Sequence, residues 1–414
     1  MLQIYEGVIH KITNMGRLTT GVIGLIVVLA MAWAINDRVF WIRWFSQPPG
    51  DTVLLNWQWY QPVDVIKDGP SPPLPVADQP DLTIEEDALA EAQAYAEEFD
   101  SLAFLVARNG VLQLEHYGEG QDRETVIDSQ SMHKGLLGVV TTVALDQGFI
   151  PSLDTPVSTY IPEWGSDGRR DITVGHLLKM TSGLTQVEYG TSAFAPGQRL
   201  FFGEDLDGPV RALPLAFEPG TAFDFNHMNS QALHAVLTGA TGLSYADFVR
   251  EYLWDPIGAG FAQVRLDREG GAARIFCCVQ TRPMDWMRLG LMLSKGGRVD
   301  GEQVISEDWV TRLMSGSDLN PNFGFHVWLG SPYTGSRLVS EPQDRRSPVS
   351  AEFLADDVMY VEGRGGQRLY VVPSAGLVAY RAGRIDFSWD DAKIMNILLG
   401  GIRQNADSTD EQDG

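Results

Sequence analysis

The chain has 414 residues, of which 44% are hydrophobic, so it can form one large hydrophobic core or two smaller ones. Its 54 acidic and 31 basic residues give a formal net charge of −23. This charge argues against a nucleic-acid partner and against electrostatic docking on anionic lipid. No spacing of cysteine and histidine indicates a zinc site, and no metal or cofactor is expected.

Residues 18–35 form an uncharged apolar run, LTTGVIGLIVVLAMAWAI, whose length is at the lower limit for spanning a bilayer. Lys11 and Arg17 precede the run, which favours a cytoplasmic location for residues 1–17. The run is either a signal peptide, because AWA has the form of a cleavage site, or an uncleaved signal anchor; a buried core helix is the remaining alternative. The aromatic and basic stretch VFWIRWF follows it and favours the anchor. We therefore expect an inner-membrane anchor with the bulk of the chain in the periplasm; the alternative is an exported chain.

Residues 36–81 contain many prolines without any periodicity, which predicts an extended linker. Within it, the stretch NWQWY is either a short strand or a patch at a membrane interface. One folded domain is expected over residues 82–402. The polar and acidic residues 403–414 are expected to be disordered.

Strands at both ends of the domain are expected to flank a helical middle. Asn109-Gly110 separates two apolar runs, the strongest short-range signal for a hairpin, and two or three strands are expected over residues 357–383. Helices are expected at 84–99, from Ser131 onward, within 172–184 with Thr173 as N-cap, and at 233–238, 245–253, 284–295 and 308–314. This order predicts one sheet formed by both chain ends around a helical cluster.

The 2 cysteines of the chain, Cys277 and Cys278, are neighbours. A neighbouring pair rarely forms a disulfide because the geometry is strained. The pair is therefore expected to be two small buried residues on a strand.

Ser131 and Lys134 lie three residues apart at the start of an expected helix. Positions i and i+3 share one helical face, so the hydroxyl and the ammonium point the same way at the first turn. The lysine can then hold or accept the hydroxyl proton, and the helix N-terminus favours developing negative charge. The alternative is an ordinary N-cap at Ser131 with Lys134 on a solvated face.

The ordered segments of residues 82–400 resemble the serine hydrolases related to class C β-lactamases, in the branch of aminohexanoate-dimer hydrolase and its esterase relatives. Six segments carry the resemblance in order: SLAFLVARNGVLQLEHY, DSQSMHKGLLGVV, HLLKMTSGL, FEPGTAFDFNHMNSQALHAVLTGATGLSYADFV, CCVQTRPMDWMRLGLMLSKGG and GRGGQRLYVVP. The resemblance implies an α/β (α+β) fold like that of β-lactamases and penicillin-binding proteins. In that fold an antiparallel sheet flanked by helices joins an all-helical subdomain, and the site lies between them.

The resemblance also implies acyl transfer, in which Ser131 attacks a carbonyl, an acyl-enzyme forms and water releases it. A free lysine has a pKa of about 10.4. Burial and neighbouring cations can lower that pKa until Lys134 accepts the serine proton.

The second motif departs from the family pattern. The family has a tyrosine whose phenol passes protons beside the serine, whereas the aligned residues here are Phe225-Asn226-His227. Three explanations stay open: Tyr189 supplies a phenol, His227 acts as a general base, or the enzyme is slow or inactive. The ordinary alternatives are a packing role for Tyr189 and a capping or core role for His227.

The third motif is Gly363-Arg364-Gly365-Gly366-Gln367, which resembles the strand that replaces Lys-Thr-Gly in this branch. The resemblance implies an oxyanion hole made by the backbone N–H groups of Ser131 and Arg364, with Gly363, Gly366 and Phe225 beside the substrate. The alternative is a glycine-rich turn without a ligand, and the Arg364 guanidinium either meets a substrate carboxylate or points into solvent. Loss of the Lys-Thr-Gly lysine makes amides or esters more favoured substrates than β-lactams.

The sequence therefore predicts a serine hydrolase acting on a small-molecule or peptide amide or ester. The alternative is a catalytically weak or inactive penicillin-binding-like protein that binds cell-wall peptide or a partner protein. The pattern indicates no oligomeric state.

Overall fold

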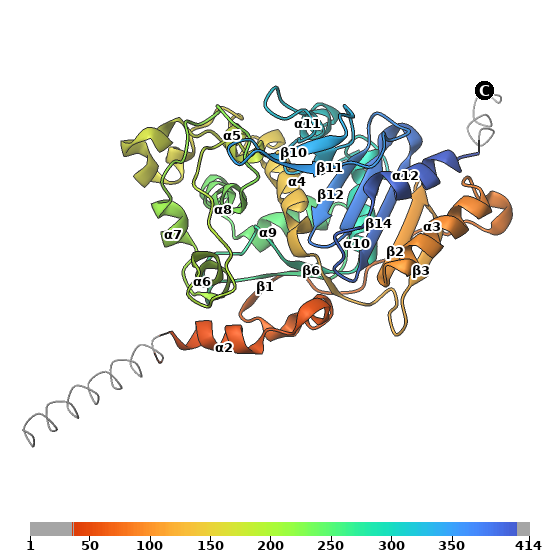
Figure 1. Ribbon diagram of the computed structural model, residues 1–414, viewed down its shortest axis with the longest axis horizontal. Helices are drawn as coiled ribbons and strands as arrows, with labels where there is room; N and C mark the ends of the chain where they lie inside the picture. Colours follow the sequence, from red (N-terminus) through yellow and green to blue (C-terminus); the bar gives the residue numbers. More distant parts are fainter. Residues whose placement is uncertain (1–34, 36, 404–414) are drawn as a thin grey trace, which may run out of the picture.

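A six-stranded antiparallel sheet forms the centre of the computed structural model, which describes residues 35 and 37–403 (Figure 1). Its strand order is β3-β2-β14-β13-β12-β9. The strands are β2 (Ser101–Arg108), β3 (Val111–Tyr117), β9 (Trp328–Leu329), β12 (Met359–Gly363), β13 (Gln367–Val372) and β14 (Leu377–Gly383). Because β2 pairs with β14, the two ends of the domain meet in one sheet, as the sequence predicts.

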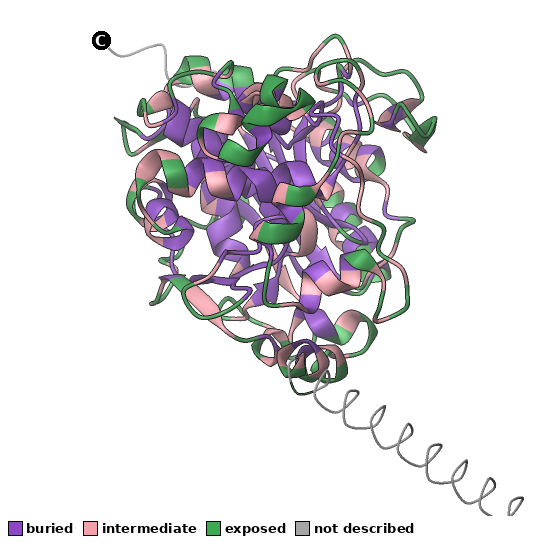
Figure 2. Cartoon of the chain, turned by 90° about the vertical axis from the view of Figure 1, so that its left-hand side faces the viewer, coloured by how far each residue is buried: buried purple, intermediate pink, exposed green. Residues whose placement is uncertain are grey.

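Apolar side chains on both faces of the sheet are buried, which is why its strands contain long apolar runs. Figure 2 shows the buried residues gathered in the interior of the molecule. Leu105 of β2 belongs to the core that includes the residues of α10 (Pro283–Ser294). Phe104, the preceding residue, belongs to the core that includes the residues of α3 (Glu86–Glu98) and α12 (Asp391–Gly400). Successive residues of a strand point to opposite faces, so helices cover the sheet on both sides.

The helices of the other half form the predicted helical part of the fold. They are α4 (His133–Asp146), α5 (Val174–Leu178), α6 (Pro196–Phe202), α7 (Asp207–Ala212), α8 (His227–Thr241), α9 (Tyr245–Val249) and α11 (Glu307–Leu313). Thr173 caps α5 as expected, because its hydroxyl accepts a hydrogen bond from the His176 N–H at 3.2 Å. Helix α8 begins earlier than expected, since the Asn226 side chain caps it through the Met228 N–H. This architecture confirms the predicted fold class.

A second, four-stranded sheet leads into the region of Ser131. It consists of β1 (Val63–Lys67), β5 (Ala262–Arg265), β6 (Val279–Thr281) and β4 (Ile127–Asp128), in that order. The remaining strands form two small two-stranded sheets: β7 (Arg298–Val299) with β8 (Glu302–Gln303), and β10 (Ser336–Ser340) with β11 (Arg345–Pro348). Such short strands give little periodic signal, so the sequence did not predict the second sheet.

Residues 37–67, here called the N-terminal arm, correct the expected linker over residues 36–81. Helix α2 (Arg38–Ser46) packs beside α6, and strand β1 pairs with β5 (Figure 1). Phe40 is 1% exposed and Tyr60 is fully buried. The aromatic side chains of the arm supply apolar surface that is buried on docking, which outweighs the extended tendency of its prolines. The stretch NWQWY contains a 3-10 turn, Trp57–Trp59, rather than a strand.

The expected membrane span at residues 18–35 lies outside the described residues, apart from Ile35. Across residues 35 and 37–403, no helix is both long enough and apolar enough to cross a membrane. The described residues thus give no support to the predictions of a transmembrane signal anchor, a membrane partner and a periplasmic location, and these predictions are not retained. Residues 1–17 and 404–414 also lie outside the described residues.

Arg43 holds the arm against the rest of the domain through hydrogen bonds, and replacement of Arg43 by methionine should destabilise the fold. Its buried guanidinium donates to the backbone oxygens of Gln61 (2.7 Å), Phe202 (3.0 Å), Gly203 (2.8 Å) and Asp267 (2.9 Å). Arg43→Met removes these donors and leaves buried carbonyl oxygens unpaired, so the free energy of unfolding should fall by about 3 kcal/mol in urea titrations.

The matched control is Arg38→Met on the exposed side of the same helix, which should change the unfolding free energy by less than about 0.5 kcal/mol. Equal unfolding free energies for the two variants would show that the arm is not held by Arg43.

Candidate active site

Ser131 lies in the middle of a 3-10 turn, Gln130–Met132, between strand β4 and helix α4. The preceding residue, Gln130, has φ +51, a left-handed conformation that costs a non-glycine residue on the order of 1 kcal/mol. Hydrogen bonds hold it there. The Asp128 carboxylate accepts from both the backbone N–H and the side-chain amide of Gln130 at 2.9 Å. The N–H of Cys278 donates to the Gln130 carbonyl at 3.0 Å.

Asp128 is fully buried and forms an ion pair with Arg265 at 2.6 Å. It also accepts a hydrogen bond from the Gln280 side-chain amide at 3.0 Å. A buried carboxylate is tolerated only when its charge is compensated and its oxygens are hydrogen-bonded. Asp128 thus ties the turn that carries Ser131 to strands β5 and β6.

Lys134 is 3% exposed, and its Nζ donates to Ser131 Oγ at 3.0 Å and to the Phe276 carbonyl oxygen. Burial lowers the pKa of Lys134 to about 7, although the Glu362 carboxylate acts in the opposite direction. The alternative of a solvated Lys134 with Ser131 as helix cap does not fit this geometry, because the residue at the N-cap of α4 is Met132.

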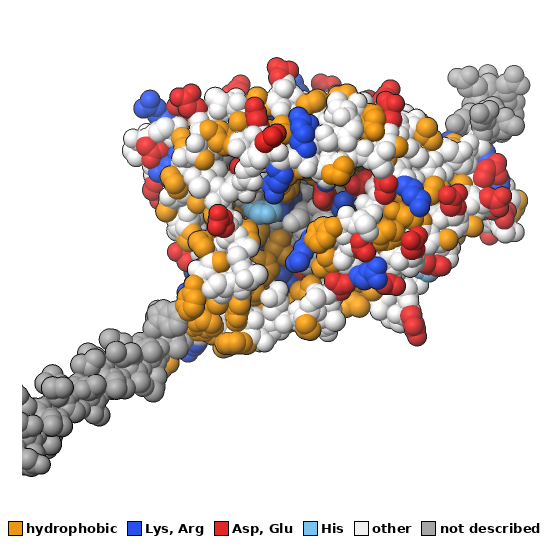
Figure 3. All heavy atoms as spheres, viewed as in Figure 1, with side chains coloured by type: hydrophobic (Ala, Val, Ile, Leu, Met, Phe, Trp, Pro, Cys, Tyr) orange, Lys and Arg blue, Asp and Glu red, His pale blue; other side chains and the backbone are white. Residues whose placement is uncertain are grey.

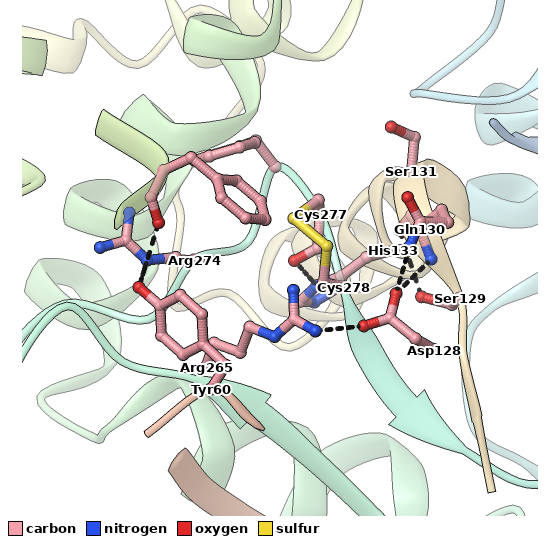
Figure 4. The surroundings of a disulfide bond; sticks show 12 residues. Tyr60, Asp128, Ser129, Gln130, Ser131, His133, Arg265, Arg274, Cys277 and Cys278 are labelled. Carbon is pink, nitrogen blue, oxygen red and sulfur yellow. Dashed lines mark hydrogen bonds and ion pairs between the residues drawn. A yellow bond between two sulfur atoms is a disulfide. The ribbon is translucent and has the colours of Figure 1, made fainter. Parts of the chain in front are cut away.

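Cys277 and Cys278 form a disulfide, which corrects the expectation of two unlinked cysteines (Figure 4). Both residues are buried as expected, but they precede β6 instead of lying in it, and Cys278 has φ +78. The left-handed turn at this position allows a pairing that an extended strand would prevent. The Cys277 carbonyl oxygen is 2.9 Å from Nδ1 of His133. Consecutive residues 276–278 therefore contact Lys134, His133 and Gln130 around the serine.

A cavity of about 820 Å³ opens at Ser131 and appears as a hollow in the face shown in Figure 3. Four of the predicted site residues line it: Ser131, Tyr189, His227 and Arg364. The N-terminal arm forms part of its wall. The sequence did not indicate this contribution, because the arm carries no motif and lies far from Ser131 along the chain.

Phe225, the first residue of the predicted second motif, lies beside Lys134. The Lys134 Nζ lies 5.9 Å from the centroid of the Phe225 ring, which stacks on Trp328. His227 is the first residue of α8, and its buried Nδ1 has no hydrogen-bond partner among the described residues. Burial, followed by the positive charges of Lys134 and Arg345, lowers the pKa of His227 well below its usual value. The imidazole is therefore neutral at pH 7.

Tyr189 lies edge-on to His227, with 5.5 Å between the ring centroids. Among the described residues, no hydrogen bond joins its hydroxyl to Ser131 or Lys134, and the side chain is 39% exposed. The structure thus brings Tyr189 to the cavity as a neighbour of His227.

Gly363 ends β12 directly against the serine turn. A Cβ atom there would lie 2.8 Å from the Ser129 carbonyl oxygen and 2.7 Å from the Gln367 Cβ, so only glycine permits this approach. The next residue, Arg364, is exposed and lines the cavity, without an ion pair in the described part of the chain. Gly366 does not line the cavity; it lines a separate one of about 450 Å³ with Arg368 and Asp391. Of the third motif, Gly363 and Arg364 therefore lie near Ser131, whereas Gly366 lies at the separate cavity.

The described residues contain no group of three or more histidine, cysteine or acidic side chains that could hold a metal ion. The sequence did not identify Asp128, Arg265 and Phe276, which hold the serine turn and Lys134 in place. A signal existed for Asp128 alone, because an aspartate two residues before a turn residue often accepts its backbone N–H. The other two come from distant parts of the chain.

Comparison with known proteins finds relatives in sequence and in fold. A family model described as Beta-lactamase matches residues 87–276. The 6-aminohexanoate-dimer hydrolase of Paenarthrobacter ureafaciens is 26% identical over 248 residues, which cover 55% of this chain and 60% of that enzyme. The match thus spans less than two thirds of the relative's length.

Solved structures share the fold. A Bacillus anthracis protein assigned as a 6-aminohexanoate-dimer hydrolase has a TM-score of 0.64 at 17% identity, over 84% of this chain and 92% of that one. A family VIII carboxylesterase has a TM-score of 0.57 at 20% identity, over 80% of this chain and 99% of that one. As the six ordered segments predict, residues 87–276 match the β-lactamase family, and the chain is similar to an aminohexanoate-dimer hydrolase in sequence and to hydrolases and esterases in fold.

Proposed function

We propose that the protein is a serine hydrolase that cleaves an amide or ester through an acyl-enzyme on Ser131, with Lys134 as the base. The observation that carries the proposal is the buried Lys134, whose Nζ is 3.0 Å from Ser131 Oγ. The proposed catalytic unit is the domain of residues 82–402 together with the docked N-terminal arm.

Lys134 is suited to accept the serine proton in its neutral form. One N–H of the amine donates to the Phe276 carbonyl oxygen, which leaves the nitrogen lone pair free for the hydroxyl of Ser131. The same burial that lowers the pKa of Lys134 makes proton return to the leaving group favourable, because the charged form is poorly solvated.

His227 is the better candidate to replace the missing phenol. Its neutral imidazole has an unpaired Nδ1 and lies on the cavity wall, so it can relay a proton to a departing oxygen or nitrogen. Tyr189, which lies against the edge of His227, is proposed to orient the imidazole.

The oxyanion hole is proposed to consist of the N–H groups of Ser131 and Arg364. The close approach of Gly363 to the Ser129 carbonyl supports this assignment, because it brings the start of the 364–366 turn beside the serine turn. Two fixed donors stabilise the tetrahedral intermediate where negative charge develops.

An amide or ester substrate is favoured by the relatives, one named for an aminohexanoate dimer and another as a carboxylesterase. A β-lactam is a poorer candidate, because the Lys-Thr-Gly cation is absent. The absence of a phenol at Phe225 favours the second candidate function, a weak or inactive penicillin-binding-like protein that holds a peptide in the cavity.

A fluorophosphonate probe separates the two functions. We expect it to label the purified protein at one site, and Ser131→Ala to abolish labelling, because Ser131 lines the cavity and has Lys134 as a base within hydrogen-bond distance. The exposed Ser192 beside the cavity provides the control, and Ser192→Ala should label normally. A labelled penicillin should react more slowly than the phosphonate. Labelling that persists in Ser131→Ala would disprove the assignment of the nucleophile.

Activity should rise with pH through the titration of Lys134. Its pKa of about 7 means that the amine is protonated and unable to accept a proton below pH 7, and free above it. For a neutral ester, kcat/KM should therefore increase about tenfold per pH unit below pH 7 and level off above it. Lys134→Arg should lower kcat/KM at least about a hundredfold, because arginine stays charged at every tested pH. A rate independent of pH between 5 and 8 would rule out this base.

Paired variants assign the second proton carrier. His227→Ala should lower kcat for an ester by about a hundredfold, the usual contribution of a positioned acid–base group. Tyr189→Phe keeps the ring against His227 and removes only the hydroxyl, so kcat should change by less than about threefold. The reverse order would identify Tyr189 as the proton carrier. If kcat is unchanged in both variants, Lys134 is the sole proton carrier.

A further inference from the structure

The N-terminal arm reaches the cavity at Ser131 from outside the region that matches the family model, which begins at residue 87. From the arm, Trp44 at the end of α2 and residues 47–51 and 53 line the cavity together with Ser131 and His227. The arm therefore forms a wall of the substrate cavity that belongs to this chain and not to the matched family region.

The arm is held firmly enough to act as a wall. Its Arg43 guanidinium binds backbone oxygens of two neighbouring segments, and Asp37 forms an ion pair with Arg199 of α6 at 2.6 Å. Strand β1 pairs with β5, which ends in Arg265, the partner of Asp128. The wall is thus attached to the same framework that holds the serine turn.

The surface that the arm presents beside α6 is aromatic. Trp44 lies edge-on to Phe202, with 5.3 Å between the ring centroids, and Phe201 and Phe202 also line the cavity. Rings fixed in this way offer a flat apolar surface at little cost in conformational entropy. Such a surface favours an apolar substrate group over a charged one.

The apolar surface continues outward along α2. Phe45 is 78% exposed and stacks on Trp41, which lies edge-on to the 67% exposed Phe194. Figure 3 shows apolar side chains gathered at the rim of the hollow near α2. An exposed apolar strip that leads into a cavity is typical of a binding groove.

We propose that the N-terminal arm is the specificity-determining subsite of this hydrolase and binds an apolar alkyl or aryl chain of the substrate against Trp44. The inference rests on the proposed function, since the chain is attached to the carbonyl that Ser131 attacks. The favoured substrate is then an ester or amide with a polar reacting end and an extended apolar group, which runs from Ser131 past Trp44 toward Phe45.

Two p-nitrophenyl esters test this subsite, the acetate and the octanoate, which share a leaving group and differ in chain length. Trp44→Ala should lower kcat/KM for the octanoate about tenfold through a higher KM, and change the acetate by less than about twofold. Phe45→Ser alters a side chain that is 78% exposed, and it should lower kcat/KM for the octanoate about threefold.

Trp57→Ala is the matched control, because it removes the same side chain from the same arm at a position that does not line the cavity. Trp57→Ala should leave the ratio of kcat/KM for the octanoate to kcat/KM for the acetate unchanged. An unchanged ratio in both Trp44→Ala and Phe45→Ser would overturn the proposal, as would an equal loss in Trp57→Ala.

A binding measurement keeps this test independent of catalysis. p-Nitrophenyl octanoate is titrated into Ser131→Ala and into the same protein carrying Trp44→Ala, with calorimetry as the readout. The second protein should bind about tenfold more weakly. Equal affinities would overturn the subsite even if the wild-type protein is an active hydrolase. Weakened binding without any wild-type turnover would support the subsite and refute the proposed function.

Discussion

The carboxylate of Asp128 is the constraint on which the arrangement around Ser131 depends. It holds Gln130 in a left-handed conformation just before the serine, and its own charge is compensated by the fully buried Arg265. Removing either partner would leave an uncompensated charge in the core, which costs several kcal/mol. The serine turn, the second sheet and the N-terminal arm therefore meet at one ion pair.

Burial gives Lys134 its proposed role and also limits the chemistry around it. The helix α4 that carries it is enclosed on nearly every side, so the ammonium loses solvation and its pKa falls to about 7. A neutral base in an apolar site needs a partner that can carry protons outward. Position 225 is a phenylalanine. His227 lies on the cavity wall, is neutral at pH 7 and has an unpaired Nδ1 among the described residues, so it is suited to that role.

The N-terminal arm shows how a segment outside the matched family region can contribute to a site. Its packing depends on aromatic side chains and on Arg43, whose guanidinium pairs carbonyl oxygens that would otherwise be buried without donors. The docked arm lines the cavity beside α6. The shared framework accounts for the family resemblance, whereas the arm gives this chain its own wall.

The sequence by itself determined the elements with strong local signals: the Asn109-Gly110 hairpin, the helices α3, α4 and α10, the meeting of both chain ends in one sheet, and the proximity of Ser131 and Lys134. Periodicity and i, i+3 spacing are local properties, so they can be read from the chain. Tertiary structure alone decided the burial of Lys134, the Asp128–Arg265 pair, the Cys277–Cys278 disulfide and the docking of the arm. Each of these depends on contacts between distant segments or on a backbone conformation such as φ +78 at Cys278, and neither leaves a periodic trace in the sequence.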